Sequence, residues 1–251
     1  MLVGVGWPRQ AGFVIVSVHL ADVGRPVALR LLRTKLDPAK VPGLRYAVMT
    51  TTAPLSGHLL PRPNLGGVGL IAAWDDDRAV EDFLAGHPLA ERLAHGWRVR
   101  LRPTRIYGAW SPLPDLPDRL AGEESADAAE PAAVLTIGRL RLTQTIRFLK
   151  ASARAEELAV RDPALLASTG LARPPGLVAT FSLWRSIPAM RAYVQGSTDP
   201  GHLAALEAHA AQPFHHESAF VRFRPYGAVG EWDGRNPLAA TASETLGARG
   251  G

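Results

Sequence analysis

His202 is the residue with the clearest potential for cofactor chemistry in this chain of 251 residues. It follows helix-breaking residues at positions 196–201 and precedes a segment of helical character, so its ring can point between a sheet and its helices. A neutral imidazole in such a place is a common ligand of haem iron. The alternative is that His202 only caps the following helix. His87 is the alternative ligand, although Pro88 gives it different surroundings.

A second group consists of His215, His216 and Glu217, which follow one another in the sequence. Neighbouring residues on a strand point to opposite faces, so the two histidines are poorly placed to share one metal ion. His209 with His216, or His215 with Glu217, stays open as a pair. We interpret the group as mainly structural, with proton transfer as the alternative, and these three residues are the catalytic candidates.

Arg185 is a further candidate for cofactor binding because it directly follows Trp184 at the end of an apolar run. A guanidinium forms bidentate hydrogen bonds to carboxylates, so Arg185 could pair with a haem propionate or a substrate carboxylate. The structural alternative is a helix cap or a surface arginine.

Several kinds of chemistry are excluded by what the sequence lacks. It has no cysteine, which rules out disulfides, thiolate metal sites and cysteine-ligated iron. It also has no Gly-rich phosphate loop, no Gly-x-Ser-x-Gly and no His-Glu-x-x-His. The formal charge of +5 comes almost entirely from arginines spread along the chain, so no nucleic-acid partner is expected.

The elements that position these residues follow the order β-α-β-β-α-β twice. Alternating or β-rich apolar runs predict strands, and apolar residues at helical spacing predict helices. The first set has strands at 12–20, 44–52, 68–74 and 97–106, and helices at 26–36 and from 75 onwards. The second has strands at 134–142, 167–171, 176–184 and 218–225, and helices at 143–160 and from 186.

Similar short passages recur about 115 residues apart, a spacing too long for a solenoid. Arg100-Leu-Arg-Pro103 followed by Gly108-Ala-Trp110 matches Arg222-Phe-Arg-Pro225 followed by Gly230-Glu-Trp232. Each half has a sheet with helices on one face and an apolar opposite face, so the two sheets should pack together. The predicted fold class is α+β, with tandem ferredoxin-like repeats forming a single-chain pseudo-dimeric α+β barrel.

The predicted domains are a first repeat at 1–110, a Pro/Ala/acidic linker at 111–131, a second repeat at 132–238 that holds His202, and a disordered tail at 239–251. The linker is expected to be exposed. The apolar run at 12–21 is too short to cross a bilayer, so a cytoplasmic protein is expected.

A family resemblance covers nearly the whole chain. It is carried by Val178-Ala-Thr-Phe-Ser-Leu-Trp-Arg-Ser186, Pro200-Gly-His202, Phe214-His-His-Glu217, Phe220-Val-Arg-Phe223 and Trp232-Asp-Gly-Arg-Asn-Pro-Leu238, and in the first half by Pro42-Gly-Leu44 and Ala72-Ala-Trp-Asp75. These passages resemble the spheroidene monooxygenase family, the acyclic carotenoid 2-ketolases. The resemblance implies an α+β barrel that uses haem and oxygen to oxidise an apolar polyene, with His202 matching the family's histidine in its Pro-x-His stretch.

One stretch departs from the family pattern. The family has Trp-Phe, a basic residue and two glutamates where this chain has Phe214-His-His-Glu-Ser218, so one carboxylate is missing. A changed pocket indicates a changed substrate.

The leading hypothesis is a haem-dependent monooxygenase that holds an apolar, carotenoid or other isoprenoid, substrate between the two sheets. The cofactor would supply the oxidation chemistry, and an electron donor protein is required because no flavin or nicotinamide motif is present. The alternative is a non-catalytic protein that binds haem or a hydrophobic metabolite. Peripheral contact with a membrane and the oligomeric state stay open.

Overall fold

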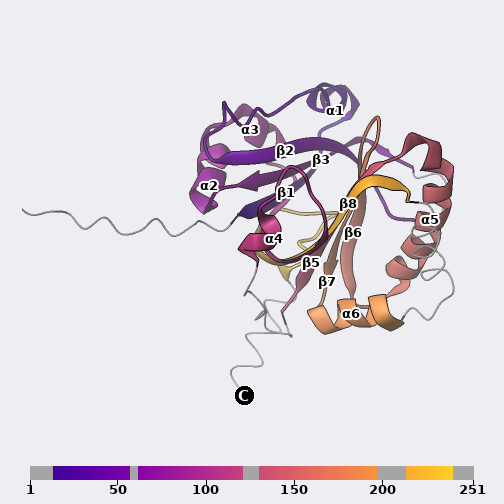
Figure 1. The fold of residues 1–251 in the computed structure, drawn as a ribbon. Helices are drawn as coiled ribbons and strands as arrows, with labels where there is room; N and C mark the ends of the chain where they lie inside the picture. The colour runs from indigo at the N-terminus through magenta and orange to yellow at the C-terminus, as the bar shows by residue number, and fades with distance from the viewer. Residues whose placement is uncertain (1–13, 57–61, 121–129, 197–212, 240–251) are drawn as a thin grey trace, which may run out of the picture.

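Eight antiparallel strands close into one barrel, with helices on its outside (Figure 1). The computed structural model describes residues 14–56, 62–120, 130–196 and 213–239. The first half comprises β1 (Ile15–Asp22), α1 (Arg25–Leu31), β2 (Leu44–Ala53), β3 (Asn64–Trp74), α2 (Asp77–Gly86), α3 (Pro88–Leu93) and β4 (Trp97–Gly108). After it come α4 (Leu116–Arg119), β5 (Ala132–Leu140), η1 (Leu142–Gln144), α5 (Thr145–Arg161), β6 (Leu165–Arg173), β7 (Leu177–Trp184), α6 (Ile187–Gly196) and β8 (His215–Val229).

The order of strands around the barrel is β1-β3-β2-β6-β7-β5-β8-β4. It contains β4-β1-β3-β2 from the first half and β8-β5-β7-β6 from the second, so strands with the same rank along each half hold the same lateral place. The halves meet where β2 pairs with β6 and where β4 pairs with β8. The predicted α+β barrel and the twofold β-α-β-β-α-β order are confirmed at this level.

The interior of the barrel is filled by side chains. On β4, for example, Trp97, Val99 and Leu101 point inward, whereas the arginines between them point outward. Buried side chains from all eight strands join this core, as do Trp110, Leu113 and Leu116 from the chain between the halves. An eight-stranded barrel is just wide enough for its own side chains to fill. The predicted substrate chamber between the sheets is therefore wrong, because apolar side chains occupy that space.

The first part of the predicted linker is also buried. Leu113 is 1% exposed and Leu116 is 0% exposed, and both pack against the barrel core together with Trp110. The prolines and acidic residues around them concealed this role, because the expectation of an exposed linker rested on average composition. The acidic stretch at 121–129 lies outside the described residues.

The outer face of the first half is closely covered. Asp76 caps α2 by accepting a hydrogen bond from the Ala79 backbone N–H at 2.8 Å, as its sequence position predicts. The helix then places Phe83 against Trp74, with ring centroids 5.0 Å apart. His19 on β1 lies beneath this layer and is 2% exposed.

No helix among the described residues is both long and apolar enough to cross a membrane.

Candidate functional site

Among the residues that the structure describes, the outer face of the second half is only partly covered, in contrast to that of the first half. Thr136 lies on β5, between β7 and β8, and points outward because its neighbours Leu135 and Ile137 belong to the barrel core. A central strand position of this kind is usually buried under helices. Thr136 is nevertheless exposed. The sheet is thus accessible near its middle.

The row of residues through Thr136 has small side chains on β5, β7 and β6, and Phe220 on β8. Thr136 pairs with Thr180 on β7, and Thr180 pairs with Gly170 on β6. The neighbouring row contains Gly138, which pairs with Val178. Because these side chains are small, they project little above the sheet on the uncovered face.

The equivalent row in the first half carries large side chains. Counted from Trp74 and Trp184, which end the corresponding strands β3 and β7, Thr180 matches Leu70. Through the pairing of the strands, Thr136 then matches His19 and Gly170 matches Met49. Thr136, Thr180 and Gly170 together have much less side-chain volume than His19, Leu70 and Met49. This smaller volume accounts for the difference in coverage between the two halves.

The cover at one end of this face comes from α6. Ala132, Val134, Trp184, Ile187 and Met190 form a small buried cluster there. The ring of Tyr193 packs on Trp184 at 4.9 Å, and its hydroxyl donates a 3.0 Å hydrogen bond to the Ala155 carbonyl of α5. Burial raises the pKa of Tyr193, and the nearby charge of Asp162 adds to the effect. Tyr193 therefore ties the two helices together in its neutral form.

His215 stands at the other end of the same face. Its ring packs on Phe148 of α5 with centroids 5.1 Å apart. A Cβ atom at Gly138 would come within 2.7 Å of the ring, so this glycine is what lets His215 lie flat against β5. A register shift between β5 and β8 at Arg139/Leu140 turns His215 outward.

Glu217 points to the opposite side of the sheet, at the mouth of the barrel. Its carboxylate accepts hydrogen bonds from the backbone N–H and the hydroxyl of Ser111. His215 and Glu217 consequently do not converge on one point. His216 is exposed beside them. Among the described residues, no group of three or more His, Asp or Glu is arranged to hold a metal ion.

The other predicted site residues are placed as follows. Arg185 is exposed at the end of β7, next to Trp184 and the start of α6. His87 lies in the helical layer of the first half, where it stacks on Phe83 at 4.9 Å and its Nδ1 accepts a hydrogen bond from the Leu89 N–H. His202 and His209 lie outside the described residues.

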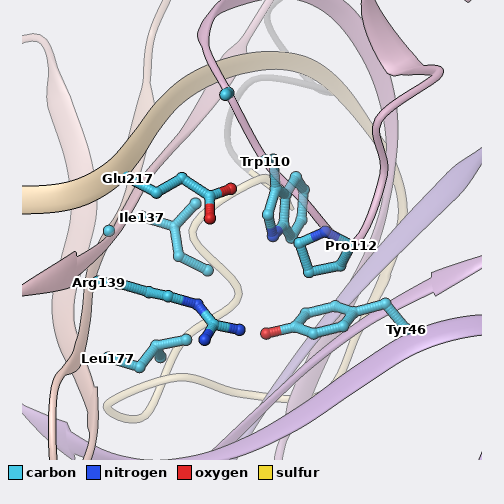
Figure 2. A pocket seen from close by; sticks show the side chains of 9 residues that line it. Tyr46, Trp110, Pro112, Ile137, Arg139, Leu177 and Glu217 are labelled. Carbon is cyan, nitrogen blue, oxygen red and sulfur yellow. The ribbon is translucent and has the colours of Figure 1, made fainter.

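A separate small hollow opens at the mouth of the barrel (Figure 2). Its space is about 280 Å³, including the part open to solvent, which is at the low end of ligand pockets. The guanidinium of Arg139 and the hydroxyl of Tyr46 point toward one another across it, and the carboxylate of Glu217 faces the same space (Figure 2). Trp110, Pro112 and Leu177 form apolar walls.

The electrostatics of this hollow keep Tyr46 protonated. Burial raises the pKa of its phenol to about 12, an effect reinforced by the Glu217 charge and opposed by Arg139 and Arg173. A neutral phenol and a guanidinium are both hydrogen-bond donors, so the hollow can hold a small group that bears acceptors, such as a carbonyl or a carboxylate. It is too small for a long polyene.

The sequence analysis did not identify the residues that form the uncovered face of the second half and the hollow at the barrel mouth. Thr136 and Gly138 carried a weak signal, namely small outward residues in a strongly apolar strand, but nothing in the pattern shows whether a helix covers them. Tyr46 and Arg139 come from different halves of the chain and meet only because the barrel closes.

The closed antiparallel barrel with helices outside it defines the class of this protein, an α+β barrel of the ferredoxin-like kind. The spheroidene monooxygenase of Rubrivivax gelatinosus is 31% identical over 238 residues, which span 91% of this chain and 89% of that protein. The spheroidene monooxygenase of Rhodobacter capsulatus is 29% identical over 194 residues, 73% of this chain and 77% of its own length. The chain belongs to the spheroidene monooxygenase family and is an oxidoreductase of the monooxygenase type.

A solved structure supports the same fold. An aldoxime dehydratase in complex with butyraldoxime aligns with a TM-score of 0.54 over 91% of this chain and 86% of that chain, at 12% identity. A likeness at this identity concerns the architecture alone. No family model matches the sequence.

Proposed function

We propose that the protein inserts oxygen into an apolar polyene of the carotenoid or wider isoprenoid kind, and that haem is its cofactor. The observation that carries the proposal is the similarity, over most of the chain, to two proteins named spheroidene monooxygenase. In a monooxygenation, one atom of O₂ enters the substrate and the other leaves as water. The reaction consumes two electrons, which an electron donor protein would supply, and two protons, which would come from water.

The uncovered outer face of the second half suits a flat, apolar macrocycle better than the barrel interior does. The interior is filled by side chains, so it offers no place for haem. Outside, Gly138 and Gly170 have no side chains, and Thr136 is exposed in the centre of the sheet. Side chains as large as those of the first half would close this space, so the small residues favour a ligand here.

Four groups of the chain are proposed to hold the cofactor. Thr136 and Gly138 would form the floor beneath the macrocycle. Arg185, at the α6 end of the face, would pair with a propionate. His202, which follows α6 in the sequence, would hold the iron through its imidazole, with His87 as the less favoured alternative because its Nδ1 already caps α3.

When bound, haem would supply the activation of oxygen, and the chain would supply binding, orientation and exclusion of water. Tyr193, which is only partly buried, would contribute an apolar wall beside the substrate. His215 lies nearest to this face among the three catalytic candidates, so we propose proton transfer for it. Glu217 and Tyr46 face the hollow at the barrel mouth and would act on neither cofactor nor polyene directly.

We also infer that the two halves are tandem ferredoxin-like repeats. The matching strand order supports this, as does the correspondence of Trp74 with Trp184 at the ends of β3 and β7. A duplicated fold would explain why one half could keep a closely packed outer face while the other opened its face for a ligand.

The experiment is an oxygen-labelling assay on the full chain loaded with haem. The protein is incubated with an acyclic carotenoid in detergent, a ferredoxin and its reductase as electron donor, and ¹⁸O₂. We expect a product that contains ¹⁸O, found by mass spectrometry and absent without oxygen or without the donor. Haem-loaded protein that yields no labelled product from any acyclic carotenoid or related isoprenoid would contradict the proposed function.

A further inference from the structure

Two large apolar side chains are strongly exposed within one short segment where β5 leads into α5. Leu142 is 62% exposed and Ile146 is 68% exposed. They are four residues apart across the junction of η1 and α5, a spacing that brings side chains to one face of a helical turn. The other strongly exposed large apolar residues that the structure describes occur singly, at Leu29, Leu65, Tyr107, Val160 and Val229. Single residues of this kind are normal, whereas a contiguous pair calls for a partner.

Positive charge surrounds this apolar tip, as we call Leu142 with Ile146. The segment 139–153 contains Arg139, Arg141, Arg147 and Lys150 but neither Asp nor Glu. All four cationic side chains are exposed. Apolar side chains flanked by cations are complementary to a surface with an anionic outer layer and an apolar interior.

The helix α5, which carries Ile146, also borders the uncovered face of the second half through Phe148. Phe148 follows Ile146 by two residues and packs on His215, with ring centroids 5.1 Å apart. His215 in turn lies against Gly138 on the floor of that face. Residues two apart lie on different sides of a helix, so the apolar tip and the edge of the proposed site lie on different sides of α5.

We propose that the apolar tip docks the protein on the surface of an anionic lipid bilayer. The purpose of this docking rests on the proposed function, because a carotenoid-like polyene dissolves in lipid and not in water. The two apolar side chains would enter the boundary between headgroups and acyl chains, and the four cations would bind the anionic headgroups. A second copy of this chain is a poor occupant of the tip, since a symmetric contact would bring the same cations together.

The test is sedimentation of the full-length protein with vesicles. Vesicles of equal parts phosphatidylglycerol and phosphatidylcholine are compared with vesicles of phosphatidylcholine alone. We expect binding to the anionic vesicles that weakens as salt is added. The double variant Leu142→Ser/Ile146→Ser should lower the partition constant at least about tenfold, because two apolar side chains no longer enter the bilayer.

The matched control is Leu29→Ser/Leu65→Ser, which removes two exposed apolar side chains from α1 and β3 of the first half and should leave the partition constant unchanged. Thermal unfolding of both variants checks that they fold. Equal binding by the two double variants, or a wild-type protein that binds no vesicles, would overturn the proposal. A wild-type dimer in light scattering that becomes monomeric only in the Leu142→Ser/Ile146→Ser variant would also overturn the proposal.

The two proposals can fail separately. Oxidation of a detergent-dispersed carotenoid does not require a bilayer, so a protein that oxidises it without binding vesicles contradicts only the docking. Vesicle binding without any oxidation contradicts only the proposed function.

Discussion

Thr136 on β5 holds the position in the second half that His19 on β1 holds in the first, yet Thr136 is exposed and His19 lies beneath α2 and α3. Each side chain points away from the barrel core. β1 lies between β4 and β3, and β5 lies between β8 and β7. The same barrel therefore presents one closed outer face and one partly open one. This asymmetry is the structural basis for placing the site in the second half.

The buried His19 should make stability depend on pH. Burial, with a smaller effect of Arg98, lowers its pKa from 6.5 to about 3, so the folded protein keeps the ring neutral. Below pH 6.5 the unfolded chain takes up a proton that the folded protein does not. As the pH is lowered from about 6.5 to 3, the free energy of unfolding should therefore fall, and this group should contribute up to roughly 1.4 kcal/mol per pH unit.

Urea unfolding at a series of pH values measures this slope. His19→Leu should reduce it, whereas His95→Leu, at an exposed position, should leave it unchanged. An equal slope in both variants would show that His19 is not the group responsible.

The chain between the halves should behave as part of the core. Leu116→Ala should cost about 2–5 kcal/mol of unfolding free energy, because the side chain is fully buried against the barrel. Leu65→Ala, at an exposed position on β3, should change it by no more than about 0.5 kcal/mol. If both substitutions change the unfolding free energy by the same small amount in urea, the Leu116 side chain is not part of the barrel core.

His87 should matter for stability and not for haem. His87→Ala removes the acceptor of the Leu89 N–H at the start of α3 and should cost about 1 kcal/mol. His87→Asn keeps an acceptor there and should retain most of that stability. A haem absorption band that disappears in both variants would instead identify His87 as the ligand.

The fold was largely predictable because its strands alternate or are uniformly apolar. The run 44–52 and the arginines alternating with Trp97, Val99 and Leu101 predicted β2 and β4 well. β6 was harder, since residues 167–170 in its middle are small or polar and its length depends on pairing with β7. The helix predicted at 26–36 ends at Leu31, because the backbone N–H groups of Arg33 and Thr34 bond to carbonyls only three residues back and form a turn that the apolar spacing did not reveal.

The site was less predictable, for reasons of packing. Alternation shows which face of a strand is apolar, but not whether two facing sheets leave a space between them, and here Phe181, Phe223 and Leu135 fill it. The exposure of Thr136 depends on how far α5 and α6 extend over the sheet. The separation of His215 from Glu217 depends on a shift of register between β5 and β8. None of these is a property of one segment.

The most direct test of haem over the second outer face is the absorption spectrum of protein purified from cells supplied with a haem precursor. We expect a Soret band in the wild type and in Thr34→Phe, a control on the other half. The band should weaken at least about tenfold in Thr136→Phe, whose ring would fill the floor, and in His202→Ala, which removes the imidazole. A wild type without the band, or a Thr136→Phe variant that folds and keeps the full band, would contradict this placement.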